Sequence, residues 1–276
     1  MKSDEGLFRT GPSTRNPALP HLPARPDKPR DTGVTMVMDK GLSVRQAEDL
    51  AATAGPLVDY VKFGFGTALV ARGTKEKAAI YRAAGIRAYL GGTLFEAFLV
   101  RGRFDDYRRF VDDLGLDTVE VSDGSMPLDP ARKCELIHTL ARDCRVLSEV
   151  GAKRADRNPP PERWPTLMQA ELEAGAHHVI AEARESGNLG IYRGDGSPDS
   201  ALIDRILAGI PAERVIWEAP AKAQQVWFVK RLGPNVNLGN IAPDEAVSLE
   251  TIRIGLRGDT FRDYLPAALL LDGARE

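Results

Sequence analysis

The chain has 276 residues, of which 43% are hydrophobic and 28% are charged, with 37 Lys and Arg against 39 Asp and Glu. This length suits one α/β domain of roughly 250 residues, and the composition argues against a chain that is disordered throughout. The formal net charge of −2 argues against a nucleic-acid binder that relies on a global positive field. We therefore predict a globular protein without a nucleic-acid partner.

The sequence carries no sign of export or membrane insertion. Its two cysteines, Cys134 and Cys144, are too few for a disulfide scaffold and fit a reducing cytosol. No apolar run approaches the ~20 residues of a membrane span, and residues 1–10 lack the apolar core of a signal peptide. We therefore expect a cytoplasmic protein without a membrane partner.

The first 30 residues differ in composition from the rest. Prolines recur at positions 12, 17, 20, 23, 26 and 29, with few large apolar residues between them. This pattern predicts an extended, Pro-rich N-terminal arm over 1–30, followed by one domain over 31–276. A solvated tail is the simpler interpretation of residues 1–22. The basic stretch from Arg25 to Arg30 is expected to lie across the rim of the domain or on a neighbouring subunit of a homo-oligomer.

From residue 34 onward, short apolar runs alternate with helical segments. The runs lack strict polar alternation, as expected for strands that are covered on both faces. The predicted strands are Val34–Met38, Tyr60–Phe63, Arg87–Leu90, Thr118–Val121, Val146–Ser148, His178–Ala181, Val215–Trp217 and Asn235–Leu238.

The segments between these runs have helical periodicity, most clearly residues 43–54, 130–143, 221–232 and 243–255. Ser43, with Gln46 three residues later, has the pattern of a capping box. Eight strand–helix alternations predict a (β/α)8 TIM barrel. An open doubly wound sheet is the competing fold, but no dinucleotide-binding fingerprint accompanies the alternation.

Acidic residues recur where the predicted strands end, which is where barrel enzymes place their working residues. One such residue is most simply a solvated loop residue. Acidic residues at the ends of strands 4 to 7 together would be costly to bury unless a cation offsets them. A Mg²⁺ ion with oxygen ligands meets that need, and Glu149, Glu182 and Glu218 are the predicted ligands.

Basic side chains share the same predicted rim, namely Lys40, Lys62, Lys153, Arg184 and Lys222. Carboxylates beside lysine and arginine predict a site for a metal ion and an anionic substrate. Asn237, Gly239 and Asn240 follow or end the eighth predicted strand, where the backbone of a barrel often holds phosphate. A Gly-Asn loop is also consistent with an ordinary turn.

Nine motifs follow one another along the chain: TMVMDKGL, DYVKFGFGTAL, GGTLFEAF, VEVSDGS, VLSEVGAK, EARESGNLGIY, WEAPAKAQQVWFV, NVNLGNI and LETIRIGLRGDT. Together they resemble the phosphosulfolactate synthase family over about Arg25 to Thr260. The resemblance implies a (β/α)8 barrel and a Mg²⁺-dependent addition of sulfite to phosphoenolpyruvate. The product would be (2R)-phospho-3-sulfolactate, an intermediate on the way to coenzyme M.

With this resemblance, residue roles follow as hypotheses. Lys153 is the candidate general acid that protonates C2, with Lys62 as the alternative, and burial among cations is expected to lower the pKa of either toward neutrality. Arg184 would bind phosphate or sulfonate bidentately. The remaining expected substrate ligands are Lys40, Asn237, Gly239 and Asn240.

The resemblance leaves two other functions open. The motif around Lys153 has one lysine where many relatives have two, and the family also contains plant members linked to heat-stress tolerance. The chain is therefore also consistent with an enzyme that acts on another anionic substrate, or with a non-enzymatic stress-tolerance protein. Intact charges at so many strand ends favour an enzyme.

Overall fold

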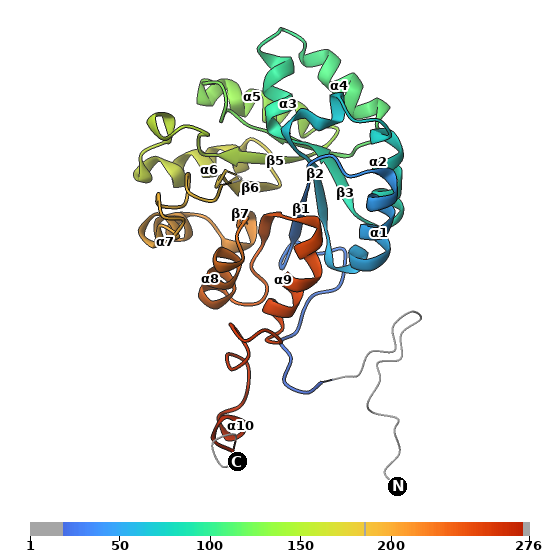
Figure 1. The fold of residues 1–276 in the computed structure, drawn as a ribbon. Coiled ribbons are helices and arrows are strands. Elements are labelled where there is room, and N and C mark those ends of the chain that lie inside the picture. Colours follow the sequence, from blue (N-terminus) through green and yellow to red (C-terminus); the bar gives the residue numbers. More distant parts are fainter. Residues whose placement is uncertain (1–18, 185, 273–276) are drawn as a thin grey trace.

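Eight parallel strands form the predicted barrel in a computed structural model that describes residues 19–184 and 186–272 (Figure 1). Seven of the strands begin and end within two residues of their predicted positions. The strands are β1 (Thr35–Asp39), β2 (Tyr60–Phe63), β3 (Arg87–Leu90), β4 (Thr118–Val121), β5 (Arg145–Val150), β6 (His178–Ala181), β7 (Val215–Glu218) and β8 (Leu238–Ile241).

Hydrogen bonds link the strands in the order β3-β2-β1-β8-β7-β6-β5-β4. The first strand therefore pairs with the last, and β3 and β4 contact each other across the remaining seam. Consecutive strands are parallel and joined by helices, as the alternation of the sequence predicts. The competing open sheet is wrong because the ladder curves round to bring its two edges together.

Helices surround the barrel on the outside (Figure 1). They are α1 (Val44–Ala54), α2 (Thr74–Ala83), α3 (Gly92–Leu99), α4 (Phe104–Asp113), α5 (Pro130–Leu140), α6 (Trp164–Glu173), α7 (Ser200–Gly209), α8 (Lys222–Leu232) and α9 (Ala246–Arg253). The short helix α10 (Ala267–Asp272) lies away from the barrel, near the C-terminus. The capping box at α1 is confirmed, since Ser43 and Gln46 exchange both hydrogen bonds. No helix in the described ranges is both long and apolar enough to cross a membrane.

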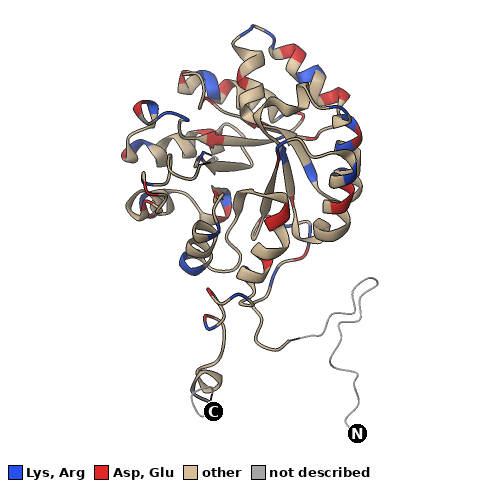
Figure 2. Cartoon of the chain, viewed as in Figure 1, with Lys and Arg blue, Asp and Glu red and all other residues tan. Residues whose placement is uncertain are grey.

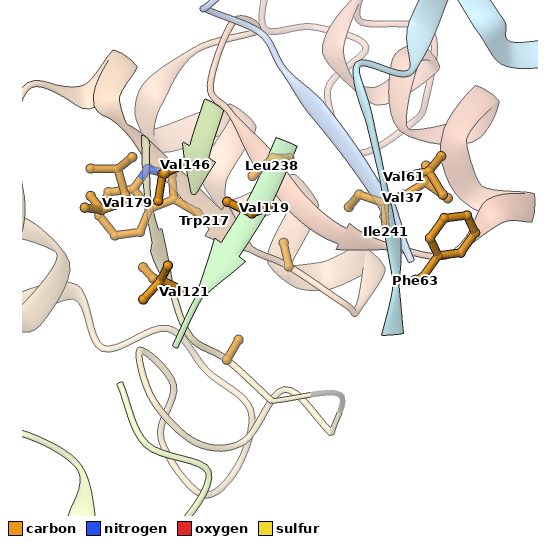
Figure 3. Close-up of a cluster of buried hydrophobic side chains, with 14 of the residues drawn as sticks. Val37, Val61, Phe63, Val119, Val121, Val146, Val179, Trp217, Leu238 and Ile241 are labelled. Atoms are coloured by element: carbon orange, nitrogen blue, oxygen red, sulfur yellow. The ribbon is translucent and has the colours of Figure 1, made fainter. Parts of the chain in front are cut away.

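Side chains on alternate positions of each strand face the helices or the barrel interior. The outward set, which includes Val37, Val119 and Trp217, packs with the helices into one large core (Figure 3). The inward set forms a small apolar layer of Val34, Met36, Tyr60, Tyr89, Leu147, Ile180 and Ile216. In contrast to these apolar layers, the outer helices carry charged residues of both signs (Figure 2).

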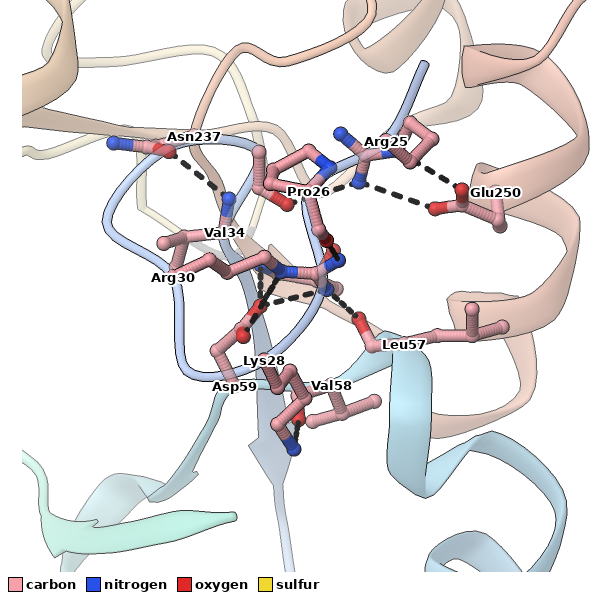
Figure 4. Close-up of polar contacts among 12 residues, drawn as sticks. Arg25, Pro26, Lys28, Arg30, Val34, Leu57, Val58, Asp59, Asn237 and Glu250 are labelled. Atoms are coloured by element: carbon pink, nitrogen blue, oxygen red, sulfur yellow. Dashed lines mark hydrogen bonds and ion pairs between the residues drawn. The ribbon is translucent and has the colours of Figure 1, made fainter. Parts of the chain in front are cut away.

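The basic stretch of the arm is bound to the barrel at the amino-terminal ends of the strands (Figure 4). Arg25 pairs with Glu250 on α9 at 2.9 Å and donates to the carbonyl of Gly33 just before β1. Arg30 pairs with the buried Asp59 at 3.0 Å. The stretch thus lies across a rim of the barrel, and this rim is at the end opposite the predicted site, because the acceptors of its cations lie before β1 and β2 and on α9. Residues 1–18 of the predicted arm lie outside the described residues.

We expect the basic stretch of the arm to contribute to the stability of the fold, and residues 1–22 to contribute little to activity. Arg30→Ala should lower the free energy of unfolding by about 3–5 kcal/mol, because it leaves the buried Asp59 carboxylate unpaired. Thermal denaturation measures this loss. Arg132→Ala is the matched control, since its pair with Glu135 is exposed and exposed pairs contribute about 0–1 kcal/mol.

Deletion of residues 1–22 should leave kcat within a few-fold, and a collapse of activity would contradict that expectation.

Candidate active site

The barrel interior changes from apolar to charged along the strands. A residue two positions after an inward side chain also points inward, because side chains alternate across a strand. Four charged residues occupy the position two residues after the apolar layer, one each on or directly after β2, β5, β6 and β7. They are Lys62, Glu149, Glu182 and Glu218, in that order, and all four are buried. This alternation builds a charged layer at the carboxyl ends of the strands.

Three side chains of this layer bring carboxylate oxygens together. One oxygen each from Glu149, Glu182 and Glu218 lies within 4.8 Å of the other two. Oε1 of Glu149 is buried and has no hydrogen-bond partner among the described residues. A buried acceptor without a donor is costly, and a cation would satisfy it. The predicted ligand set is thus brought together, and its oxygen donors fit Mg²⁺.

The ammonium group of Lys62 lies among these carboxylates. Its Nζ is 2.9 Å from Glu120, 3.3 Å from Glu149 and 3.5 Å from Glu218. Burial alone would lower the pKa of Lys62, but the neighbouring carboxylates raise that pKa well above its ordinary value. The expected pKa near neutrality is therefore wrong for Lys62, because anions surround it.

Lys153 reaches the charged layer from the loop after β5. Its Nζ donates to Oγ1 of Thr93 at 2.7 Å and lies 3.8 Å from Glu149. Burial opposes its charge, yet Glu149 and Glu182 raise its pKa above the ordinary value. The expected lowering is wrong for Lys153 as well. Its side chain is 27% exposed, so a ligand that enters from solvent can reach the ammonium group.

Burial disfavours the ionised form of every carboxylate in this layer. At Glu149 the two lysine ammonium groups outweigh burial and hold the pKa at about 2. At Glu182, burial acts together with the charges of Glu149 and Glu218, and its pKa lies well above the ordinary value. Burial also raises the pKa of Glu120 to about 7. The layer holds more carboxylates than its lysines neutralise, which is the electrostatic condition of a cation site.

A cavity of about 240 Å³ lies at this end of the barrel. Lys62 and the three clustered glutamates line it, and so do Lys153, Arg184 and Asn240. Thr93 adds the amino end of α3, where backbone N–H groups and the helix dipole favour an anion. The cavity therefore places a carboxylate cluster beside groups that bind anions.

Strained backbone also marks the cavity. Of four non-glycine residues with positive φ in the described ranges, three line it: Phe65 at 54°, Arg184 at 54° and Asn240 at 58°. They follow β2 and β6 or lie within β8. Such conformations cost free energy and cluster at functional sites, so they support this cavity as the active site.

Surrounding residues hold the glutamates in place. Lys133 from α5 donates to the backbone carbonyl of Glu149 at 2.6 Å and pairs with Glu171 at 2.8 Å. Tyr192 donates to the backbone carbonyl of Glu218 at 2.6 Å, and the backbone N–H of Ala183 donates to the carboxylate of that residue at 3.1 Å. These contacts fix the strand ends that carry the cluster.

Asn237 does not belong to the cavity. Its side chain accepts from the backbone N–H of Val34 and donates to the carbonyls of Asp31 and Glu213, at the amino end of the barrel. The prediction that it binds phosphate is wrong. The cause is the position of β8, which begins at Leu238 rather than at Asn235.

Two further predicted substrate ligands are also placed elsewhere. Gly239 lies inside β8, and a Cβ at this position would stand 2.6 Å from Met36 and 2.9 Å from Ile216. Gly239 therefore makes room within the apolar layer and does not form a phosphate loop. Lys40 is exposed directly after β1 and is not among the residues that line the cavity. Of the predicted substrate ligands, Arg184 and Asn240 do line it.

Three site residues were not among the predicted ones. Glu120 on β4 holds Lys62 and accepts from the backbone N–H of Gly92 at 2.5 Å. Its inward position on the fourth strand was a usable signal, because the same alternation selects the other glutamates. Thr93 and Phe65 gave no such signal, since a threonine or a phenylalanine shortly after a strand is common without a role.

Comparison with known proteins adds evidence for the family. The model of the (2R)-phospho-3-sulfolactate synthase (ComA) family matches residues 23–259. Phosphosulfolactate synthase from Methanothermobacter thermautotrophicus is 44% identical over 86% of this chain and 95% of its own length. The Bacillus subtilis phosphosulfolactate synthase is 38% identical over 87% and 96%. Protein HEAT-STRESS-ASSOCIATED 32 from Arabidopsis thaliana is 26% identical over 90% and 94%.

Solved structures resemble the chain in fold alone. The 3-hexulose-6-phosphate synthase from Salmonella typhimurium aligns with a TM-score of 0.53 at 14% identity, over 81% of this chain and all of that one. The YdjI aldolase from Escherichia coli K12 aligns with a TM-score of 0.54 at 8% identity, over 89% of this chain and 86% of its own. Both likenesses agree with the barrel.

Proposed function

This chain belongs to the (2R)-phospho-3-sulfolactate synthase family, an enzyme family, and we propose that it catalyses the Mg²⁺-dependent addition of sulfite to phosphoenolpyruvate. One observation carries the proposal. A single cavity combines three clustered carboxylates with Lys62, Lys153 and Arg184. Both reactants are multiply anionic, so a site for them needs a divalent cation and several cationic side chains.

The chemistry sets what each group must do. The sulfur lone pair of sulfite forms a bond to C3 of phosphoenolpyruvate, and the C2–C3 π pair moves toward the substrate carboxylate. C2 then takes a proton, which gives (2R)-phospho-3-sulfolactate with no bond to phosphate broken. Two unit charges of like sign 4 Å apart repel by about 4 kcal/mol at an effective dielectric of 20. Countering this repulsion is the main task of the site.

Glu149, Glu182 and Glu218 would hold the Mg²⁺ ion, since their oxygens converge and Oε1 of Glu149 accepts no hydrogen bond among the described residues. When bound, the ion supplies Lewis-acid stabilisation to the negative charge that develops on the substrate carboxylate. Lys62 stays beside the cluster, anchored by Glu120 at 2.9 Å. It balances part of the charge of the glutamates and keeps a cation close to the same end of the substrate.

The phosphate and the sulfite would lie toward the other cations of the cavity. Arg184 is exposed, and its guanidinium can donate two parallel hydrogen bonds to one anionic group. Lys153, with Thr93 at the amino end of α3, offers a second anion position. Lys153 is also the proposed proton donor to C2, because its ammonium group carries a proton and faces the cavity. Asn240 remains as a polar contact from β8.

Incubating the purified protein with Mg²⁺, sulfite and phosphoenolpyruvate tests the proposed function. We expect a phosphorylated organic sulfonate, seen by phosphorus NMR and mass spectrometry, and its loss when a chelator removes the metal ion. Unchanged phosphoenolpyruvate at saturating sulfite would contradict the proposal. Binding without turnover would then favour another anionic substrate, and absence of binding would favour the stress-tolerance role suggested by the plant relative. We also propose a cytoplasmic location, which the two free thiols support.

A further inference from the structure

Phe65 combines two unfavourable features at the mouth of the cavity. It has φ of 54°, a left-handed conformation that costs a bulky residue free energy because Cβ crowds the following carbonyl. Its side chain is 54% exposed, and none of the ring contacts among the described aromatic residues involves it. Neither burial nor aromatic packing in this chain offsets the strain, so the position of Phe65 points to a role toward a ligand.

The surrounding segment holds this conformation. Phe65 lies in the short helical turn Gly64–Leu69 after β2, next to Gly66 at φ of 69°. A Cβ on Gly64 would collide with Met38, so the absence of a side chain there lets the turn approach β1 closely. Phe65 and Met38 both line the cavity. They are its only large apolar residues in the described part of the chain.

The proposed substrate has one part that suits an apolar wall. Its carboxylate and its phosphate are matched by the metal ligands and the cationic side chains, which leaves the methylene carbon C3. We propose, resting on the proposed function, that Phe65 is a specificity-determining residue that packs against the edge of C3, leaves a face of this carbon open to sulfite, and excludes enolpyruvate phosphates with a substituent on it. An extra methyl group on C3 would need the volume that the ring occupies.

Two ligands and three variants test this inference. The ligands are phosphoenolpyruvate and its homologue with a methyl group on C3, and the variants are Phe65→Ala, Phe65→Gly and Phe261→Ala. Calorimetry gives the two Kd values and turnover with sulfite gives the two kcat/KM values. One methyl group in an apolar site changes selectivity by about 10–200-fold. We expect the preference for phosphoenolpyruvate to fall at least tenfold in both Phe65 variants and to stay unchanged in Phe261→Ala, whose ring is equally exposed at 54%.

The pair of Phe65 variants separates the ring from the backbone. Both lack the ring, but glycine adopts positive φ without strain, so Phe65→Gly should unfold at a Tm about 2–4 °C above that of Phe65→Ala. Equal Tm values would overturn the claim that Phe65 is held against strain. Unchanged selectivity in both variants would overturn the specificity role while leaving the proposed function intact. Failure of the wild-type protein to bind either ligand would overturn both.

Discussion

Lys153→Ala should lower kcat by roughly 10²–10⁴-fold, the usual contribution of a general acid. Binding of phosphoenolpyruvate should stay largely intact, because Arg184 and the metal ligands still hold the substrate. Steady-state kinetics at saturating sulfite, with calorimetry for phosphoenolpyruvate, measure the two effects. Lys222→Ala is the control, since that lysine pairs with Asp259 on the surface and should keep full activity.

Lys153→Arg decides between two roles for this residue. A guanidinium group is too weak an acid to donate a proton near pH 7, so a proton donor is not rescued by arginine. If Lys153 instead binds sulfite electrostatically, arginine should restore much of the turnover, and the alanine variant should show mainly a raised KM for sulfite. Near-wild-type kcat in Lys153→Arg would end the proton-donor assignment and shift it to Lys62.

Glu149→Gln should abolish tight binding of Mg²⁺. The substitution removes the charge of the carboxylate whose Oε1 accepts no hydrogen bond among the described residues. Loss of an outer contact to a metal ligand costs about 10–100-fold in affinity, and loss of a ligand should exceed this. Titration of the metal by calorimetry, without substrates, measures the effect, and activity should recover only partly in excess Mg²⁺.

Glu120→Gln is the matched control for this result. Glu120 and Glu149 are equally buried and both pair with Lys62, but only Glu149 belongs to the oxygen cluster. If binding depends on ligation, Glu120→Gln should retain most of the Mg²⁺ affinity. Equal losses in the two variants would show that general negative charge, not the cluster, attracts the ion. Full affinity in Glu149→Gln would remove this residue from the ligand set.

The alternation of apolar runs and helices was sufficient to predict the barrel and seven of its strands. The eighth strand was misplaced because its residues have low β-propensity: Gly239 and Asn240 read locally as a turn. In the barrel they form a strand, since Gly239 leaves space for Met36 from β1. That requirement comes from barrel closure, which no local pattern of the last strand contains.

The glutamate cluster was predictable because it depends on one rule, the convergence of strand ends at one rim. The direction of the pKa shift of Lys62 was not predictable, because it depends on distances across the barrel. The carboxylate nearest to its Nζ comes from Glu120, two strands later in sequence and across the seam between β3 and β4. A sequence places cations and anions at the same rim, and only the structure shows which of them touch.

The pairing of β1 with β8 has a consequence for how this chain is made. A ribosome delivers β1 first, while β8 and the α9 residue Glu250, which Arg25 contacts, emerge near the end of translation. Until then the nascent chain carries β1 with one open edge, and open edges recruit other chains. Barrel closure is thus a late event in biosynthesis. A stop codon before β8 would leave the first strand with an open edge, and a stop codon before Glu250 would leave Arg25 without its partner on α9.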